Sequence, residues 1–266
     1  EMIYVIGFFG NVSKAFWNTR AMRIVHWIGS DIQGMLGMSW GANRNLVDAF
    51  NREKFIHLVE CGQTKGELEA MGLKCHVVPL PMDVDQFKIT PLPKEPVIAV
   101  YFPEGNNNNY RLQYNSDLMQ DIAESMPDVK FKFFGGNRIQ TLNNIEYVGY
   151  IDHKDMPDFI STCTAVLRVT LHDGLPISPI EFLLSGREAL VTVPNMPGTT
   201  YLGHGRVSDD NYAQKKEEII KGLREMLATP TPVKDRLAQI QYWRDKVNIR
   251  RSREVMNDIL RGKYDA

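Results

Sequence analysis

The stretch that decides the fold reads RVTLHDGLPISPIE and spans residues 168–181. It starts in an apolar run, passes through a Gly/Pro turn and enters a helical pattern at Ser178. Pro179 suits the first helical position, because proline has no N–H to leave unsatisfied there. A second apolar run follows at residues 189–193. Strand, turn, helix and strand in this order indicate one repeating unit of a parallel sheet.

The same alternation runs through the whole chain. Short apolar runs rich in β-branched and aromatic residues are separated by segments with helical periodicity. The runs cover residues 2–9, 23–28, 54–59, 76–79, 97–102, 129–134, 145–147, 165–170 and 189–193. Besides the helix that opens at Ser178, helical segments are expected at residues 117–125, 155–161, 216–227 and 233–260. Strands that alternate with helices predict an α/β protein with parallel sheets.

Proline marks a boundary between two parts of the chain. Five of the 14 prolines lie within residues 79–96, and proline fixes φ and removes a backbone donor, so regular structure is not expected there. We predict two Rossmann-like domains that face each other across a cleft, formed by residues 1–90 and 91–245, with a helical segment at 246–266. Ligands of such sheets bind outside the carboxyl ends of the strands. One large sheet interrupted by a proline-rich loop is the alternative.

Composition excludes several classes of protein. Lys and Arg total 31 against 32 for Asp and Glu, so the net charge of -1 gives no general attraction to nucleic acid or anionic lipid. Cys61, Cys75 and Cys163 lie far apart, which argues against a disulfide framework or a zinc site. No apolar run reaches the roughly 18–20 residues of a membrane span, and no signal peptide is recognisable. A cytoplasmic protein without a bound metal is therefore expected.

Residues 173–181 carry the clearest chemical signal. The free N–H groups at the start of the helix and the Gly174 turn form a site of the kind that binds diphosphates. Asp173 at the strand end and Glu181 near the helix start are placed to face a ligand there. Ser178 and Glu181 also have the spacing of a capping box, in which Glu181 only helps to begin the helix. Both interpretations stay open.

This strand–turn–helix resembles the signature of retaining nucleotide-sugar glycosyltransferases of the GT-B type, family four. The family has an acidic residue, seven intervening residues and a glutamate, and here these are Asp173 and Glu181. Residues 145–151 resemble the segment that cups the nucleotide base, and residues 67–87 resemble the end of the first domain and the linker. The resemblance covers most of residues 55–200. It implies a GT-B fold with a shortened N-terminal domain.

The resemblance also implies an activity and a set of site residues. The expected reaction transfers a sugar from a UDP, GDP or ADP sugar to a hydroxyl of a glycan, lipid-linked sugar or small molecule. Configuration is retained, and neither a metal nor a cofactor takes part. Glu181 would bind the ribose, and Asp173 would contact the transferred sugar. The other donor-binding residues carried over are Gly174, Leu175, Pro176, Ile177, Val148, Gly149 and Tyr150.

Several residues depart from the family pattern or have weaker support. Asp173 stands where the family usually has Glu, and of the family's Arg and Lys only Arg111 is present. Arg168 is a candidate to replace the missing Lys, or else a strand-end charge that reaches solvent. Gly10 is a candidate near the phosphates, but its surroundings favour the alternative, a structural turn glycine. His26 is a candidate catalytic residue on the acceptor side, or a core histidine.

Other functions remain open from the sequence. The departures favour, as the main alternative, a non-catalytic subunit that binds sugar nucleotides or assembles with other proteins. An epimerase or phosphorylase on the same architecture is a further alternative. Arg250, Arg251 and Arg253 cluster near the C-terminus. Such a run is typical of a solvated helix face, and a peripheral contact with a membrane surface is the other interpretation.

Overall fold

The computed structural model describes residues 1–8, 17, 19–103 and 108–263. The chain forms two compact units. The first unit consists of Glu1–Met82, His172–Leu175 and Lys246–Ala266, and the second of Asp83–Leu171 and Pro176–Asp245. The four residues His172–Leu175 therefore belong to the first unit, although the sequence on both sides of them belongs to the second.

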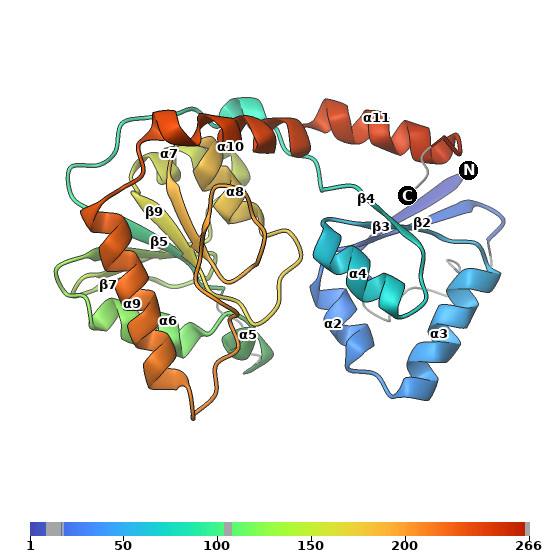
Figure 1. Cartoon of the computed structure of the whole chain (residues 1–266), viewed down its shortest axis with the longest axis horizontal. Coiled ribbons are helices and arrows are strands. Elements are labelled where there is room, and N and C mark those ends of the chain that lie inside the picture. Colours follow the sequence, from blue (N-terminus) through green and yellow to red (C-terminus); the bar gives the residue numbers. More distant parts are fainter. Residues whose placement is uncertain (9–16, 18, 104–107, 264–266) are drawn as a thin grey trace. The chain divides into compact units, whose positions relative to one another are not determined.

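The first unit is built on a parallel sheet of four strands in sequence order (Figure 1). The strands are β1 (Met2–Ile6), β2 (Met22–Trp27), β3 (Ile56–Val59) and β4 (Cys75–Val77). The helices between them are α2 (Ser30–Leu36), α3 (Trp40–Arg52) and α4 (Gly62–Ala70). Ile32 of α2, Phe50 of α3 and Leu68 of α4 belong to one buried cluster, so these helices cover the same face of the sheet.

Both faces of the first sheet are covered. Val25 and Trp27 of β2 pack with Phe50 of α3 on one face. Ile24 and Leu58 pack on the other face with Val255 and Ile259 of α11 (Ile249–Leu260). Because successive side chains of a strand point to opposite faces, a strand covered on both sides has almost no polar position. This explains the continuous apolar runs in the sequence.

The second unit has a sheet of seven strands in the order β11-β10-β9-β5-β6-β8-β7. Their bounds are Thr200–Tyr201, Glu188–Val191, Ala165–Arg168, Val97–Tyr101, Lys130–Phe134, Ile145–Gly149 and Ile139–Leu142. All pairs are parallel except β7 with β8. The chain builds outward from β5 in one direction, to β6 and β8, and then in the other, to β9 and β10. The carboxyl ends of β5 and β9 thus form a topological switch point, where ligands bind in open α/β sheets.

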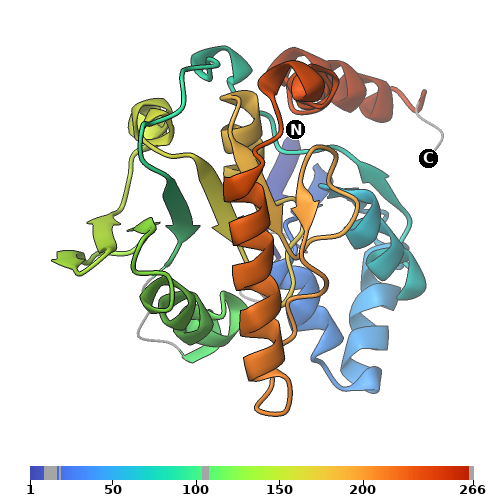
Figure 2. The ribbon, with the colours of Figure 1, turned by 60° about the vertical axis from the view of Figure 1, so that its left-hand side comes forward.

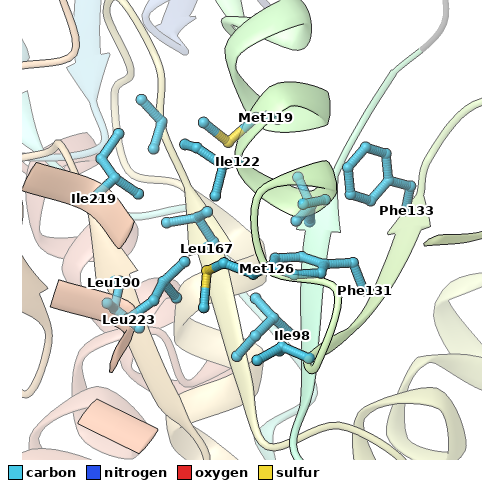
Figure 3. Packing of buried hydrophobic residues seen from close by; sticks show 14 of the residues in the cluster. Ile98, Met119, Ile122, Met126, Phe131, Phe133, Leu167, Leu190, Ile219 and Leu223 are labelled. Carbon is cyan, nitrogen blue, oxygen red and sulfur yellow. The ribbon is translucent and has the colours of Figure 1, made fainter. Parts of the chain in front are cut away.

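Helices cover both faces of the second sheet. They are α5 (Asn108–Gln113), α6 (Ser116–Glu124), α7 (Met156–Ser161), α8 (Ile177–Leu184), α9 (Tyr212–Ala228) and α10 (Val233–Lys246), with the short turns η1 (Val84–Gln86) and η2 (His153–Asp155). Met119 and Ile122 of α6 pack with Ile219 and Leu223 of α9 against Phe131 and its neighbours in the sheet (Figure 3). Figure 2 shows α9, in orange, running in front of this sheet.

The α/β fold class and all the predicted strands are confirmed. The sequence did not reveal β7 and β11. All four residues of β7 are exposed and β11 has two residues, so neither has a buried apolar pattern. The helical region expected at residues 233–260 is two helices. Asn248 divides it, because its side chain accepts a hydrogen bond from the Arg250 amide and begins α11 there.

Within the second unit, a buried arginine fastens the proline-rich segment that follows η1 to the end of α7. Arg187 is fully buried. Its guanidinium donates to the Thr90 carbonyl at 2.7 Å, the Thr90 hydroxyl at 2.6 Å and the Pro91 carbonyl at 3.0 Å. It also donates to the Ile160 and Ser161 carbonyls, each at 3.2 Å. Neutral acceptors therefore surround this charge, and they hold the proline-rich segment against the end of α7.

Replacing Arg187 by Met should lower the free energy of unfolding of the second unit by about 3–5 kcal/mol, because several buried acceptors lose their donor. Urea unfolding followed by tryptophan fluorescence and circular dichroism measures this loss. Arg261→Met, at an exposed position after α11, is the control and should change stability by less than about 0.5 kcal/mol. Equal effects of the two substitutions would contradict the anchoring role.

Candidate functional site

Arg168 stands at the switch point of the second sheet. It ends β9, and its guanidinium carbon lies 4.7 Å from the ring centroid of Tyr101, the last residue of β5. The ring centroid of Tyr114 is 5.2 Å away. Contacts of this kind stabilise a cation over aromatic faces. The two tyrosines therefore hold the positive charge of Arg168 at the carboxyl edge of the sheet. This differs from the alternative that the sequence left open, a strand-end charge that reaches into solvent.

Glu181 is a buried acid beside this edge. It lies in α8, and only 3% of its surface is exposed. Burial raises the pKa of Glu181 to about 7, although the charge of Arg168 acts to lower it. Nδ1 of His153 lies 3.3 Å from Glu181 Oε1, and Nε2 of the same ring lies 2.6 Å from Gln86 Nε2. Glu181 is thus an acid that changes charge near neutral pH.

The capping-box interpretation of Glu181 is wrong. Helix α8 begins at Ile177 with Pro176 as its N-cap, two residues before the Ser178 cap that a capping box requires, and no side chain caps it. Ser178 is therefore already inside the first turn. Its hydroxyl is buried without a hydrogen-bond partner in the part of the chain that the structure describes. The acid of Glu181 is not needed to begin the helix.

The predicted base-binding segment lies at the carboxyl end of β8. Val148 and Gly149 end this strand, and the Gly149 carbonyl accepts a hydrogen bond from the Gly135 amide at 2.9 Å. Gly149 has φ +78°, which suits a residue without a Cβ atom. Tyr150 follows with 71% of its surface exposed. Its ring is available to a ligand at the same edge of the sheet that carries Arg168.

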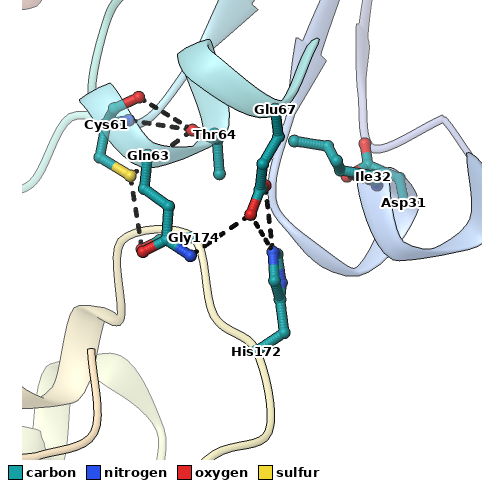
Figure 4. Close-up of polar contacts among 8 residues, drawn as sticks. All are labelled: Asp31, Ile32, Cys61, Gln63, Thr64, Glu67, His172 and Gly174. Atoms are coloured by element: carbon teal, nitrogen blue, oxygen red, sulfur yellow. Dashed lines mark hydrogen bonds and ion pairs between the residues drawn. The ribbon is translucent and has the colours of Figure 1, made fainter. Parts of the chain in front are cut away.

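Asp173 and Gly174 lie on the turn that belongs to the first unit. Figure 4 shows how this turn is held: His172 Nε2 lies 2.9 Å from Glu67 Oε1, and the Cys61 thiol donates to the Gly174 carbonyl at 3.6 Å. Gly29, after β2, has φ +99°, and a Cβ atom on it would lie 2.7 Å from the Gly174 nitrogen. Only glycine fits at position 29, because any side chain would displace the turn.

The buried acid Glu60 contacts the same turn, and a second buried acid, Asp31, acts on Glu60 electrostatically. Glu60 is 4% exposed and accepts a hydrogen bond from the Leu175 amide at 3.4 Å. Burial raises the pKa of Glu60 to about 8; the Leu175 amide lowers it, and the negative charges of Asp173 and Asp31 add to the rise. Asp31 accepts hydrogen bonds from the Phe8, Ile28 and Ile32 amides at 2.9, 3.1 and 2.9 Å. Asp31 thereby fastens the ends of β1 and β2 to α2.

The remaining predicted residues have varied surroundings. His26 is fully buried with Nδ1 2.5 Å from the Tyr4 hydroxyl, and burial lowers the pKa of His26 to about 4. This is the environment of a core histidine. Arg111 of α5 is exposed and forms an ion pair with Asp117 at 2.5 Å. Gly10 lies outside the described residues, and Leu175 and Pro176 are buried while Ile177 is partly exposed.

Sequence reasoning missed Glu60, His153 and the two tyrosines around Arg168. Glu60 directly follows the apolar run at residues 54–59. The strand-end position that singled out Asp173 would have found it as well. His153 and Tyr114 carried no comparable signal, because they meet Glu181 and Arg168 only through the fold.

Neither a metal-binding cluster nor a membrane-spanning helix occurs among the residues that the structure describes. No group of three or more His, Cys, Asp or Glu side chains is arranged there to hold a metal ion. None of the described helices combines the length and the apolar character that crossing a bilayer requires.

Comparison with known proteins identifies the fold. No protein-family model and no curated protein sequence matches the chain. Among solved structures, HepE of Anabaena in complex with UDP has a TM-score of 0.71 at 14% identity, covering 98% of this chain and 79% of that one. Sucrose-phosphate synthase of Thermosynechococcus elongatus has a TM-score of 0.71 at 12% identity, covering 98% and 73%.

A third similar structure is the pneumococcal O-GlcNAc transferase GtfA with UDP and GlcNAc. Its TM-score is 0.68 at 12% identity, and the match covers 98% of this chain and 57% of that one. Identities this low establish the fold alone. The chain accordingly has the GT-B fold of glycosyltransferases.

The raised pKa of Glu181 predicts how stability depends on pH. Between pH 4.5 and about 7 the folded protein keeps a proton on Glu181 that the unfolded chain releases. Stability from this group is therefore fully present below pH 4.5 and is lost as pH rises through 7, by about 3 kcal/mol in total. Glu181→Gln removes this titration. The free energy of unfolding of the variant should therefore rise relative to that of the wild type as pH increases from 4.5 to above 7. A pH-independent difference in free energy of unfolding would contradict the burial of this acid.

Proposed function

We propose that this protein transfers a sugar from a nucleoside diphosphate sugar to a hydroxyl group, with retention of configuration and without a divalent metal. One observation carries the proposal: Glu181 is a buried acid next to Arg168, at the switch point of a sheet in the GT-B fold. Similar structures were solved with UDP and with UDP-glucose. UDP is therefore the first nucleotide to test, and GDP and ADP are the next.

Glu181 is assigned to the ribose. An ionised carboxylate accepts two hydrogen bonds, which suits the adjacent hydroxyls of a ribose. Val148, Gly149 and Tyr150 at the end of β8 are assigned to the base, with the exposed Tyr150 ring as a stacking surface. The pKa of about 7 means that the acceptor form of Glu181 becomes dominant as pH rises through neutrality.

Arg168 and the first amides of α8 are assigned to the diphosphate. A helix start offers unpaired N–H groups, and a positive charge stabilises the negative charge that develops on the leaving group. The tyrosines hold Arg168 for this task, whereas Arg111 is engaged with Asp117. Fixed donors of this kind stabilise the leaving group without a metal ion.

Asp173 is assigned to hydroxyls of the transferred sugar. In the reaction, the bond between the anomeric carbon and the phosphate oxygen breaks, and a bond to the acceptor oxygen forms. The departing phosphate takes the acceptor's proton, so no side chain is needed as the base. The acceptor oxygen attacks the anomeric carbon directly, on the face that the phosphate leaves, so no side chain serves as nucleophile. The acceptor is proposed to be a hydroxyl of a glycan, a lipid-linked sugar or a small molecule.

Glu181→Gln should weaken UDP binding 10- to 150-fold, because a hydrogen bond to a charged group contributes about 1.5–3 kcal/mol. Isothermal titration calorimetry at pH 6, 7 and 8 should show wild-type affinity rising with pH relative to the variant. UDP itself also changes charge over this pH range, and this affects the wild type and the variant equally, so the comparison with the variant corrects for it. Glu146→Gln, on the exposed side of β8, is the matched control. Unchanged affinity in Glu181→Gln would exclude the ribose role.

Addition of a chelator tests metal independence in the same experiment. Affinity for UDP should be equal with and without EDTA, because the assigned diphosphate ligands are Arg168 and backbone amides. Loss of binding on chelation would refute metal independence and leave nucleotide binding itself intact.

Asp173→Asn should leave the affinity for free UDP within about twofold, while donor turnover falls about 10- to 150-fold. The reason is that Asp173 is assigned to the sugar and not to the nucleotide. Hydrolysis of UDP-glucose and other UDP sugars without acceptor measures turnover. Equal losses for UDP and UDP sugar would place Asp173 in the phosphate site or in folding. UDP binding without any hydrolysis by the wild type would favour the non-catalytic binding subunit.

A further inference from the structure

Glu60 touches the backbone of the turn that carries Asp173. It is the first residue after β3, and its Oε2 accepts the Leu175 amide at 3.4 Å. A Cβ atom on Gly174 would lie 2.9 Å from the same oxygen. The carboxyl group therefore lies against two consecutive residues of the turn, Gly174 and Leu175. Position 174 has no room for a side chain beside it.

The surroundings of Glu60 oppose a negative charge. Asp173 on the turn and Asp31 on α2 both act on it electrostatically, and both are acids. Tyr4 on β1 also faces Glu60; burial raises the pKa of Tyr4 to about 12, and the charge of Glu60 adds to the rise. His26, bonded to Tyr4, is held neutral by burial, which lowers its pKa to about 4. None of these neighbours supplies a positive charge at neutral pH.

Stability alone does not favour an acid at this position. A buried carboxyl group without a cationic partner costs free energy when it ionises. A glutamine would keep the acceptor oxygen for the Leu175 amide without that cost. Groups that lower stability in this way are concentrated at functional sites.

We propose that Glu60 is a positioning residue for the Asp173–Leu175 turn, and that its buried carboxyl group sets the place of Asp173 by holding the Leu175 amide. The assignment of Asp173 to the transferred sugar rests on the proposed function; the contact between Glu60 and the turn does not.

The proposal predicts an upper pH limit for sugar-dependent steps. Up to about pH 8 the carboxyl group is neutral and holds the turn. Ionisation adds a third negative charge beside Asp173 and Asp31, and the turn is displaced because desolvation and repulsion outweigh the Leu175 hydrogen bond. Turnover should then fall about tenfold per pH unit above pH 8, as for loss of one essential proton. UDP affinity should keep its value, because the nucleotide is assigned to residues of the second unit.

Two substitutions of Glu60 test this. Glu60→Gln keeps the acceptor and cannot ionise, so its turnover of UDP sugar should stay level to pH 9.5. Glu60→Leu has a similar size but no acceptor, so its turnover should be at least tenfold below that of the wild type up to pH 8 and should approach the wild-type value at higher pH, while UDP affinity changes less than twofold. Glu69→Gln on α4 is the control, since Glu69 is exposed and pairs with Lys65; it should behave as the wild type.

Hydrogen exchange provides a readout that does not depend on the reaction. Protection of the Gly174 and Leu175 amides, relative to the Glu60→Gln variant at the same pH, should fall in the wild type between pH 7 and 9. The proposal would be overturned if the turnover of Glu60→Gln fell above pH 8 as steeply as that of the wild type. The proposal would also be overturned if a folded Glu60→Leu protein protected the amides of the turn as well as the wild type does. If Glu60→Leu does not fold, the comparison of the wild type with Glu60→Gln decides the question. If no UDP binds to the wild type, the proposed function fails, and the exchange data still decide the role of Glu60.

Discussion

The common direction of the strands is the constraint on which both units depend. In a parallel sheet every carboxyl end lies at the same edge, so the residue that follows each strand is delivered to one place. In the first unit this edge receives Asp31 and Glu60, and in the second it receives Tyr150 and Arg168. The reversal of strand order at β5 then sets Arg168 beside Tyr101. The candidate site residues lie at these edges, because the central strands are largely buried and apolar along the rest of their length.

Glycine permits the closest approach in the first unit. A Cβ atom on Gly29 would collide with the backbone of Gly174, and a Cβ atom on Gly174 would collide with the Glu60 carboxyl group. The signature turn is thus defined by backbone contact as well as by its side chains. His172 with Glu67, and Cys61 with Gly174, fasten it on both sides. A turn held at so many points gives Asp173 a fixed position, as the proposed contact with a sugar hydroxyl requires.

Burial, more than ion pairing, sets the charge of the buried acids Glu181 and Glu60. Glu181 and Glu60 are both almost inaccessible, and burial raises their pKa values to about 7 and about 8. Arginines placed in the core have a different task. Arg187 and Arg236 donate mainly to backbone carbonyls and join segments of the chain. These two buried arginines fasten segments of the chain, whereas the buried acid Glu181 lies where a ligand is proposed to bind.

The sequence by itself determined the α/β class and every strand of the two sheets except β7 and β11, and it singled out Asp173 and Glu181 as candidate site residues. Those features are local: an apolar run of five residues and an acid–turn–glutamate spacing are visible in one dimension. The start of α8 at Ile177, the division at Asn248 and the exposed strand β7 depended on capping and packing and were missed or misplaced. Only the tertiary structure decided that Tyr101 and Tyr114 hold Arg168, and that Glu60 holds Leu175. The physical reason is that these contacts join residues far apart in the chain, and burial and charge act through space.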